Sequence, residues 1–327
     1  MPWLLKFSYL IITVNTMTKG KILITETTDQ LLIAGLKEMG YSCNYEPGIS
    51  QSGVAAIIHD YTGIVVATRI VVNRQLLESA TQLKFIARAG SGMENIDTLF
   101  AAGKNITCIN SPEGNANAVG EHALGLLLAF FHNIVKSNAE ISQHKWLVQE
   151  NRVHELEGRT VGIIGYGNTG KSFAKKLSPF GMTVMAYDKY LDQFGDQYAM
   201  ESSLERIFEE SEIVSLHIPL TSESIHMVDN LFLQRFKKKI FLINTARGKL
   251  IAHSALLDSI EKDKILGAAL DVYENEDFDS HTHSQAQILK GLLSTGKVIV
   301  TPHVAGKSFE SPGKIALALL DKISKII

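Results

Sequence analysis

Three segments of the sequence end an apolar run with a side chain suited to proton transfer or ion binding. Arg247 follows FLINTA, Glu276 lies in LDVYENED, and His303 follows VIVTP. Histidine titrates near neutrality and can move a proton, a carboxylate beside it fixes its tautomer, and arginine binds a carboxylate through two parallel hydrogen bonds. Taken singly, each residue has an ordinary alternative: a surface ion pair, a solvated acidic loop and a turn. Together they predict a site in which Arg247 holds an acidic substrate, His303 moves a proton and Glu276 tunes His303.

A glycine-rich stretch upstream, VGIIGYGNTG, has the pattern of a dinucleotide-binding turn. It places Gly165, Gly167 and Gly170 as G-x-G-x-x-G between an apolar strand and the helix-forming KSFAKKL. Such a turn brings the backbone close to a pyrophosphate, and the helix N-terminus supplies positive potential; a glycine-rich turn without ligand is the alternative. Asp188 ends the next strand, where a carboxylate hydrogen-bonds a ribose 2′-hydroxyl and repels a 2′-phosphate. The pattern predicts NAD in preference to NADP, a preference that the neighbouring Lys189 weakens.

Short apolar runs alternating with helical stretches must position these side chains. Six runs after residue 160 are predicted strands. Four earlier runs share their character: 21–25, 63–68, 83–90 and 106–110. Because the runs are continuous rather than alternating, they indicate strands buried on both faces of a parallel sheet. The sequence therefore predicts an α/β fold with two doubly wound parallel-sheet domains, and ligands at the carboxyl ends of the strands.

The length and composition suit a globular protein of two domains. The chain has 327 residues, 45% of them hydrophobic and 20% charged, and a net charge of −2. This balance gives no electrostatic reason to expect nucleic acid or an anionic membrane as a partner. Cys43 and Cys108 have no C-x-x-C spacing, which indicates two reduced thiols and a cytoplasmic protein.

The N-terminal segment and two long helices complete the expected organisation. Residues 1–16 are apolar but lack a cleavage site and are too short to span a bilayer. We expect them to be a non-native or disordered extension ahead of Met17. A long helix is predicted at 117–136; it is apolar around most of its circumference and should pack against more than one body. A final helix is predicted at 309–327.

Taken together, these residues resemble the D-isomer-specific 2-hydroxyacid dehydrogenase family, and phosphoglycerate dehydrogenase-like members in particular. The resemblance covers nearly all of the chain after Met17. It is carried by RAGSGMENID (88–97), NSPEGNANAVGEHALGLLLA (110–129), LEGRTVGIIGYGNTG (156–170), HIPLT (217–221), INTARGKLI (243–251), GAALDVYENE (267–276) and TPHVAG (301–306).

The resemblance implies a split fold. A flavodoxin-like substrate-binding domain would be built from both ends of the chain, residues 17–114 and 307–327. A Rossmann NAD-binding domain, residues 115–306, would be inserted between them. The family also implies NAD as cofactor, a small 2-hydroxyacid or 2-ketoacid as substrate, and a homodimer formed through the NAD-binding domains and the long helix.

The family's site residues carry over to this chain by motif. The catalytic residues would be Arg247, Glu276 and His303. The substrate contacts would be Ser91 and Gly92, through their backbone N–H groups, Asn115 and Arg247. The cofactor contacts would be Gly165, Gly167, Asn168, Thr169, Gly170, Asp188, His217, Pro219, Thr245, Ala246, Arg247, Asp271, His303 and Gly306.

The overall resemblance favours 3-phosphoglycerate and 3-phosphohydroxypyruvate as the substrate pair. The basic residue nearest to the family's phosphate-binding position is Arg69, slightly out of register. Glyoxylate, hydroxypyruvate or another 2-ketoacid is the alternative within the family. The chain departs from the family at Asp277, where proline usually follows the glutamate.

Two other classes of protein have sequences similar to this family. An NAD(H)-sensing, corepressor-like protein is one, and the intact arginine, glutamate and histidine argue against it. A formate dehydrogenase is the other, and its family pairs the histidine with glutamine where this chain has Glu276. No metal is expected, because His281 and His283 lie in a polar loop without further ligands at suitable spacing.

Overall fold

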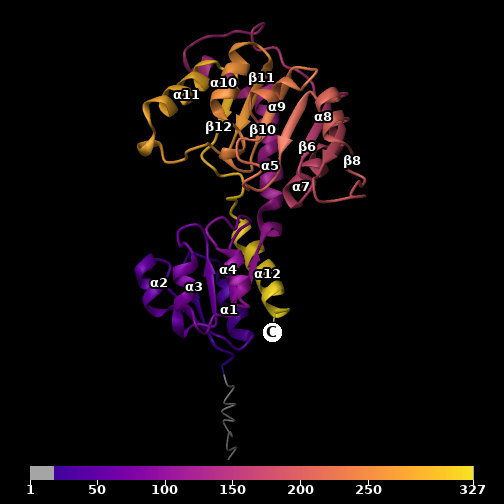
Figure 1. Ribbon diagram of the computed structural model, residues 1–327. Coiled ribbons are helices and arrows are strands. Elements are labelled where there is room, and N and C mark those ends of the chain that lie inside the picture. Colours follow the sequence, from indigo (N-terminus) through magenta and orange to yellow (C-terminus); the bar gives the residue numbers. More distant parts are fainter. Residues whose placement is uncertain (1–17, 327) are drawn as a thin grey trace, which may run out of the picture. The chain divides into compact units, whose positions relative to one another are not determined.

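The chain forms two compact units in the computed structural model, which describes residues 18–326 (Figure 1). The first unit takes the described residues up to Ala89, Asn95–Ile109 and the chain from Leu319 onward. The second takes Gly90–Glu94 and Asn110–Ala318. The first unit is therefore built from both ends of the chain. The expected extension at 1–16 lies outside the described residues.

The first unit contains a five-stranded sheet in the order β2-β1-β3-β4-β5. Its strands are β1 (Lys21–Ile24), β2 (Ser42–Tyr45), β3 (Gly63–Val66), β4 (Phe85–Arg88) and β5 (Thr107–Asn110). Strand β1 pairs in parallel with β2 and β3, and β3 pairs in parallel with β4. This order is that of flavodoxin-like sheets, so the predicted fold class is confirmed for this unit.

Helices connect these strands and use local caps. They are α1 (Gln30–Glu38), α2 (Gln51–Ile57), α3 (Arg74–Ser79) and α4 (Thr98–Gly103). Asp29 accepts a hydrogen bond from the Leu31 N–H and so starts α1, while Ser50, Asn73 and Asp97 begin the other three in the same way. These short polar side chains satisfy N–H groups that have no partner inside a helix.

The second unit contains a seven-stranded sheet in the order β12-β11-β10-β9-β6-β7-β8, and all its pairings are parallel. Its strands are β6 (Thr160–Ile164), β7 (Thr183–Tyr187), β8 (Met200–Glu201), β9 (Ile213–Leu216), β10 (Ile240–Asn244), β11 (Ile265–Leu270) and β12 (Val298–Val300). The strand order reverses between β6 and β9, as in a Rossmann sheet, where ligands bind at the carboxyl ends of the strands. The predicted Rossmann fold is confirmed.

Helices cover both faces of this sheet. They are α5 (Pro112–Phe131), α7 (Asn168–Leu177), α8 (Leu204–Glu210), α9 (Asn230–Gln234), α10 (His253–Glu261) and α11 (His283–Ser294). Helix α6 (Ile134–Ser142) follows α5 and has no buried residue, and α12 (Ser311–Ser324) contributes its residues from Leu319 onward to the first unit. One core joins α5 and α7 to alternate strand residues such as Phe241 and Ile243. The other joins α8 to α11 to the intervening residues, such as Ile240 and Leu242. Because both faces are covered, each strand reads as a continuous apolar run.

The long predicted helix is two helices in the structure. Helix α5 begins at Pro112, five residues before the predicted start at Asn117, and ends at Phe131. Asn133 then adopts a left-handed backbone, with φ of 52°, which ends one helix before α6 begins at Ile134. Among residues 18–326, no single helix is long and apolar enough to cross a membrane; α5 and α6 pass that test only as a pair, bent by 59°.

Candidate active site

The glycine-rich loop lies at the switch point, where β6 leads into α7. Gly165 has a φ of +96°, and a Cβ there would lie 2.6 Å from the carbonyl oxygen of His217, so only glycine fits this turn. Among residues 18–326, nothing lies within 4 Å of the place where a Cβ on Gly167 would be. Within the described part of the chain, no side chain caps the N-terminus of α7 at this glycine. The loop therefore presents open backbone at a helix N-terminus, as a pyrophosphate site requires.

His217, at the end of β9, ties the two sides of the switch point together. Its Nε2 lies 2.9 Å from the Ser215 hydroxyl and its Nδ1 lies 3.2 Å from the hydroxyl of Thr169, at the start of α7. Burial lowers the pKa of His217 to about 3. The ring is therefore neutral at physiological pH, so its contribution here is to orient the loop and α7.

Asp188 lies at the end of β7 beside the glycine loop. Its carboxylate accepts hydrogen bonds from the backbone N–H of Tyr166 (2.8 Å) and of Tyr190 (3.0 Å), which fix its orientation. The neighbouring Lys189 forms an ion pair with Glu223. The lysine charge that would favour a 2′-phosphate is thus already paired, and the predicted preference for NAD gains support.

Thr245, in the turn after β10, adds a group that is ready for a ligand. Its hydroxyl is buried and has no hydrogen-bond partner among residues 18–326. Buried hydroxyls usually have a partner, so an orphan at the carboxyl end of a Rossmann strand suits a bound molecule. This orphan hydroxyl and the open backbone at Gly167 fit a dinucleotide.

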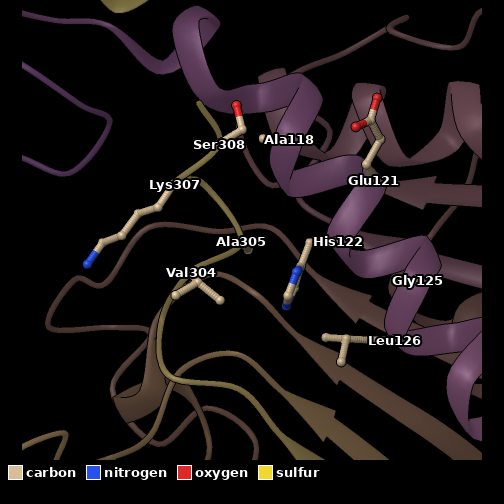
Figure 2. Close-up of a pocket in the computed structure, with 9 residues that line it drawn as sticks. All are labelled: Ala118, Glu121, His122, Gly125, Leu126, Val304, Ala305, Lys307 and Ser308. Atoms are coloured by element: carbon tan, nitrogen blue, oxygen red, sulfur yellow. The ribbon is translucent and has the colours of Figure 1, made fainter. Parts of the chain in front are cut away.

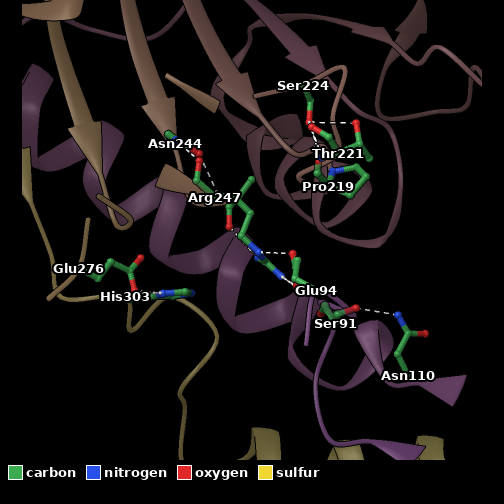
Figure 3. A network of polar contacts seen from close by, with 11 residues as sticks. Ser91, Glu94, Asn110, Pro219, Thr221, Ser224, Asn244, Arg247, Glu276 and His303 are labelled. Carbon is green, nitrogen blue, oxygen red and sulfur yellow. Dashed lines mark hydrogen bonds and ion pairs between the residues drawn. The ribbon is translucent and has the colours of Figure 1, made fainter. Parts of the chain in front are cut away.

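The structure pairs His303 with Glu276. Nδ1 of His303 lies 2.8 Å from Oε2 of Glu276, and both side chains are partly exposed (Figure 3). Glu276 lies in the connection from β11 to α11, and His303 follows β12. Burial would raise the pKa of Glu276, but the hydrogen bond and charge of His303 and the backbone N–H of Tyr273 hold it below its ordinary value. The ionised carboxylate therefore orients the ring and leaves Nε2 for a reacting group.

Asp271 holds the turn that carries His303. Its buried carboxylate accepts hydrogen bonds from the Thr301 hydroxyl (2.6 Å), the Val304 N–H (3.0 Å) and the Ala305 N–H (2.8 Å). Its backbone oxygen accepts the His303 N–H at 2.7 Å. His303 itself has a φ of +54°, a left-handed backbone conformation that is uncommon for residues other than glycine. The structure thus shows Asp271, an expected cofactor contact, fixing the backbone around the histidine.

A further histidine reaches this buried carboxylate from α5. Nε2 of His122 lies 3.4 Å from Oδ1 of Asp271 and 3.0 Å from the Thr301 hydroxyl. Figure 2 shows the His122 side chain beside Val304 and Ala305 in a pocket of about 540 Å³. Burial would raise the pKa of Asp271, but hydrogen bonds, the largest from His122, keep it below its ordinary value. Helix α5 is therefore linked to the turn after β12.

Arg247, in the turn after β10, is bound to a glutamate that the sequence reasoning missed. Its Nε lies 2.6 Å from Oε1 of Glu94 and its Nη2 lies 3.4 Å from Oε2 (Figure 3). Asn244 fixes the turn itself, because its side chain bonds the backbone of Ala246 and of Arg247. Glu94 stands in the quoted stretch RAGSGMENID, but nothing in its local sequence shows a partner so far along the chain.

The expected substrate contacts lie around Ser91. The Ser91 hydroxyl donates to Oδ1 of Asn115 at 3.0 Å, and Asn110 donates to the Ser91 carbonyl oxygen at 2.7 Å. Asn115 also packs against Gly306, since a Cβ on that glycine would lie 2.7 Å from Nδ2 of Asn115. The structure thus gathers Ser91, Asn115 and Gly306, and it places Arg247 over Gly92.

The remaining expected residues have local roles in the structure. The Pro219 carbonyl oxygen accepts a hydrogen bond from Ser224, which closes the turn after β9. His281 lies 2.9 Å from the Asn275 carbonyl oxygen, and His283 bonds Gln287. Among residues 18–326, no group of three or more histidine, cysteine or acidic side chains could hold a metal ion.

A Rossmann sheet with a G-x-G-x-x-G loop at its switch point defines a dinucleotide-binding protein. A family model described as "D-isomer specific 2-hydroxyacid dehydrogenase, NAD binding domain" matches residues 124–305. The chain therefore belongs to the D-isomer specific 2-hydroxyacid dehydrogenase family and carries its NAD-binding domain, which confirms the predicted family and cofactor.

Curated relatives agree with this assignment. The chain is 34% identical over 269 residues to a hydroxypyruvate reductase of Thermotoga maritima. That alignment covers 82% of this chain and 86% of the reductase. It is 30% identical over 315 residues to a D-3-phosphoglycerate dehydrogenase of Synechocystis sp.. This second alignment covers 96% of this chain and 55% of the dehydrogenase. The chain thus spans about half the length of that phosphoglycerate dehydrogenase.

The fold is similar to that of a solved glyoxylate reductase from Paecilomyes thermophila. The TM-score is 0.82 at 23% sequence identity, and the alignment covers 94% of this chain and 95% of that one. At this identity the likeness establishes the arrangement of strands and helices.

Proposed function

We propose that this protein interconverts a D-2-hydroxyacid and its 2-ketoacid with NAD as the hydride carrier. The observation that carries the proposal is the His303–Glu276 pair, 2.8 Å apart, at the carboxyl edge of the Rossmann sheet. Arg247, Glu276 and His303 follow β10, β11 and β12, which are neighbours in that sheet. An acid–base group and a carboxylate-binding group thus stand at the edge where this fold binds its ligands.

Each side chain has a distinct task in this reaction. Arg247 binds the substrate carboxylate and polarises the adjacent carbonyl. In the reducing direction, Nε2 of His303 donates a proton to the oxygen that becomes the hydroxyl; in the oxidising direction it removes that proton. Glu276, bonded to Nδ1, fixes the orientation of the ring. NAD, when bound, supplies or accepts the hydride.

The residues proposed to hold NAD lie along the switch point. The glycine loop and the start of α7 receive the pyrophosphate, and Asp188 receives the ribose hydroxyls. Thr245 offers a hydroxyl that has no hydrogen-bond partner among the described residues, and His217 contacts the hydroxyl of Thr169 at the start of α7. The pairing of Lys189 with Glu223 favours NAD over NADP.

We propose a small unphosphorylated 2-ketoacid, such as hydroxypyruvate or glyoxylate, as the substrate. Arg69, the candidate phosphate ligand, donates instead to the carbonyl oxygens of Thr25, Pro47 and Ile49. Arg74, another basic residue of the first unit that could meet a phosphate, is bonded to Glu78. The Thermotoga maritima hydroxypyruvate reductase also corresponds to this chain over most of both lengths.

3-Phosphoglycerate with 3-phosphohydroxypyruvate, the pair that the motifs favour, is the second candidate. The Synechocystis phosphoglycerate dehydrogenase supports it, since it is similar over 96% of this chain. A role in serine biosynthesis would follow from that substrate. The phosphorylated substrate requires a basic group that binds its phosphate, and the unphosphorylated one does not. Replacing Arg69 therefore distinguishes the two candidates.

The test is NADH consumption by the purified protein with a panel of 2-ketoacids that includes hydroxypyruvate, glyoxylate and 3-phosphohydroxypyruvate. Turnover with the unphosphorylated acids supports our proposal. Selective turnover with the phosphorylated acid, lost in Arg69→Ala, would establish the second candidate. NADH binding without turnover on any member would favour an NAD(H)-sensing protein instead.

We also propose a cytoplasmic homodimer. Segment 134–153 of the second unit exposes a series of large apolar side chains: Ile134, Val135, Ile141, Trp146, Leu147, Val148 and Val153. Trp146 is 81% exposed in the single chain, and exposed apolar patches of this kind mark interfaces. Light scattering should give twice the chain mass, and Trp146→Glu should shift the measured mass toward that of the monomer.

The proposed cytoplasmic location is supported by the cysteines. Both are unpaired, which suits a reducing compartment.

A further inference from the structure

The contact between Arg247 and Glu94 uses one particular side of the guanidinium group. Nε lies 2.6 Å from Oε1 of Glu94, and Nη2 lies 3.4 Å from Oε2. Nη1 donates to the carbonyl oxygen of Ala246 at 2.7 Å. The carboxylate therefore engages the lateral Nε–Nη2 edge rather than the terminal edge formed by the two Nη atoms.

A count of donors shows what this arrangement leaves. A guanidinium group has five N–H donors in a fixed plane. The bonds to Glu94 and Ala246 use three of them: that on Nε, one on Nη1 and one on Nη2. One N–H remains on each Nη. The terminal edge of a guanidinium, where one N–H of each Nη points the same way, has the geometry that receives both oxygens of a carboxylate.

The backbone around the guanidinium leaves it little freedom. A Cβ on Gly92 would lie 1.9 Å from Nη2 of Arg247 and 2.2 Å from Oε2 of Glu94, so the pair rests directly on that glycine. At the backbone of Arg247, the carbonyl oxygen accepts a hydrogen bond of 2.9 Å from the Asn244 side chain. The guanidinium is thus fixed by contacts from both the 90–94 segment and the turn after β10.

We infer that Glu94 is a positioning residue for the proposed reaction, one that turns the terminal edge of Arg247 toward the substrate carboxylate. The inference rests on the proposed function, because it assigns Glu94 a task in binding that substrate. It predicts that Glu94 stays on Arg247 when the substrate binds. Free rotation of the arginine would otherwise have to be lost upon binding, which weakens affinity.

An opposite role can be drawn from the same contact. Glu94 could occupy Arg247 as an internal carboxylate that the substrate must displace. The two roles predict effects of opposite sign. If Glu94 orients the arginine, removing its charge weakens substrate binding; if Glu94 competes with the substrate, removing its charge strengthens binding.

The experiment compares Glu94→Gln and Glu94→Asp with a matched control, Glu210→Gln. Glu210 receives a hydrogen bond from Nε of Arg206 at 2.7 Å on the exposed face of α8, nearly the same contact at a site without a proposed function. KM and kcat are measured for the 2-ketoacid that the wild-type protein reduces best. Affinity for NADH is measured by fluorescence, and folding by thermal unfolding.

Glu94→Gln should raise KM by about tenfold or more and lower kcat, because an ion pair with two hydrogen bonds becomes a single hydrogen bond to an uncharged amide oxygen. Affinity for NADH and the unfolding temperature should not change. Glu94→Asp should restore part of the loss, and Glu210→Gln should match the wild type. A KM at or below the wild-type value in Glu94→Gln would overturn the inference and favour the competing role.

A second readout separates this inference from the proposed function. Oxamate, an unreactive carboxylate, is titrated into the NADH complexes of the wild-type and Glu94→Gln proteins. A wild type that binds oxamate but turns over no 2-ketoacid would refute the proposed function, while the loss of oxamate affinity in Glu94→Gln would still support the role of Glu94. Equal oxamate affinities would refute that role alone. A wild type that neither reacts nor binds oxamate overturns both.

Discussion

Replacing Asp271 by asparagine should destabilise the second unit and the turn that carries His303. The Asp271 carboxylate is wholly buried and accepts hydrogen bonds from Thr301 at 2.6 Å, Val304 at 3.0 Å and Ala305 at 2.8 Å. Asparagine has the same shape but only one oxygen. An NH2 group must therefore take the place of one of the two carboxylate oxygens, where it faces a buried hydrogen-bond donor.

The geometry decides which bond is lost. If the amide nitrogen takes the Oδ2 position it faces the Ala305 N–H, and if it takes the Oδ1 position it faces Thr301, Val304 and His122. The first arrangement sacrifices fewer bonds. It removes one hydrogen bond to a charged group, worth about 1.5–3 kcal/mol, and makes the others neutral. We expect a total loss of about 2–4 kcal/mol in the free energy of unfolding.

The assay is denaturant unfolding followed by circular dichroism, with hydrogen exchange of the peptide that contains Val304 and Ala305 as a local probe. Asp263→Asn is the control: Asp263 bonds Lys239 and Lys297 on the surface, where exposed ion pairs contribute little. Asp271→Asn should lower the midpoint and speed exchange in the turn, and Asp263→Asn should do neither. Equal midpoints for the two variants would refute the reasoning.

The pH dependence of the same pair gives an internal check. The pKa of Asp271 is held below its ordinary value of 3.8. A carboxylate with a lowered native pKa stabilises the fold fully above its ordinary pKa, and that contribution is lost as the pH falls through the native value. The gap between the wild type and Asp271→Asn should therefore be constant near neutrality and close in acid.

Three further outcomes follow from the site. His303→Gln should lower turnover by about 10²–10⁴-fold while NADH still binds, and normal turnover would remove it as the acid–base group. Asp188→Ala should reduce the ratio of NAD to NADP efficiency, and an unchanged ratio would place the discrimination elsewhere. Burial lowers the pKa of His217 and of His253 from 6.5 to about 3. Between these two values the unfolded chain binds protons at both histidines, whereas the native state does not. Stability should therefore fall as the pH drops below 6.5, by about 2 kcal/mol per histidine at pH 5, and His253→Phe should make that fall shallower.

Local sequence patterns determined most of the second unit. Six of its seven strands were predictable because strands buried on both faces are continuous apolar runs. The two strands that the patterns did not reveal, β2 and β8, lie at sheet edges and expose most of their residues. A short, exposed edge strand lacks the apolar run that identifies an interior one.

The helix near residue 117 shows a different limit. Its apolar residues continue from α5 into α6, so the composition reads as one helix. The break depends on the left-handed backbone of Asn133, and its start depends on Pro112, which is favourable in the first turn of a helix. Single-residue backbone choices of this kind are too weak to recognise in the presence of a strong hydrophobic pattern.

The sequence by itself determined the types of residues that we propose for the chemistry and the strand ends that carry them. Arg247, Glu276 and His303 each end an apolar run, and parallel strands bring such ends to one edge of a sheet. Only the tertiary structure decided which groups meet: Glu94 binds an arginine 153 residues away, and Asp271 becomes the buried anchor of the His303 turn. Contacts between loops distant in the chain depend on how the strands are ordered and packed, and that information does not reside in any local stretch of residues.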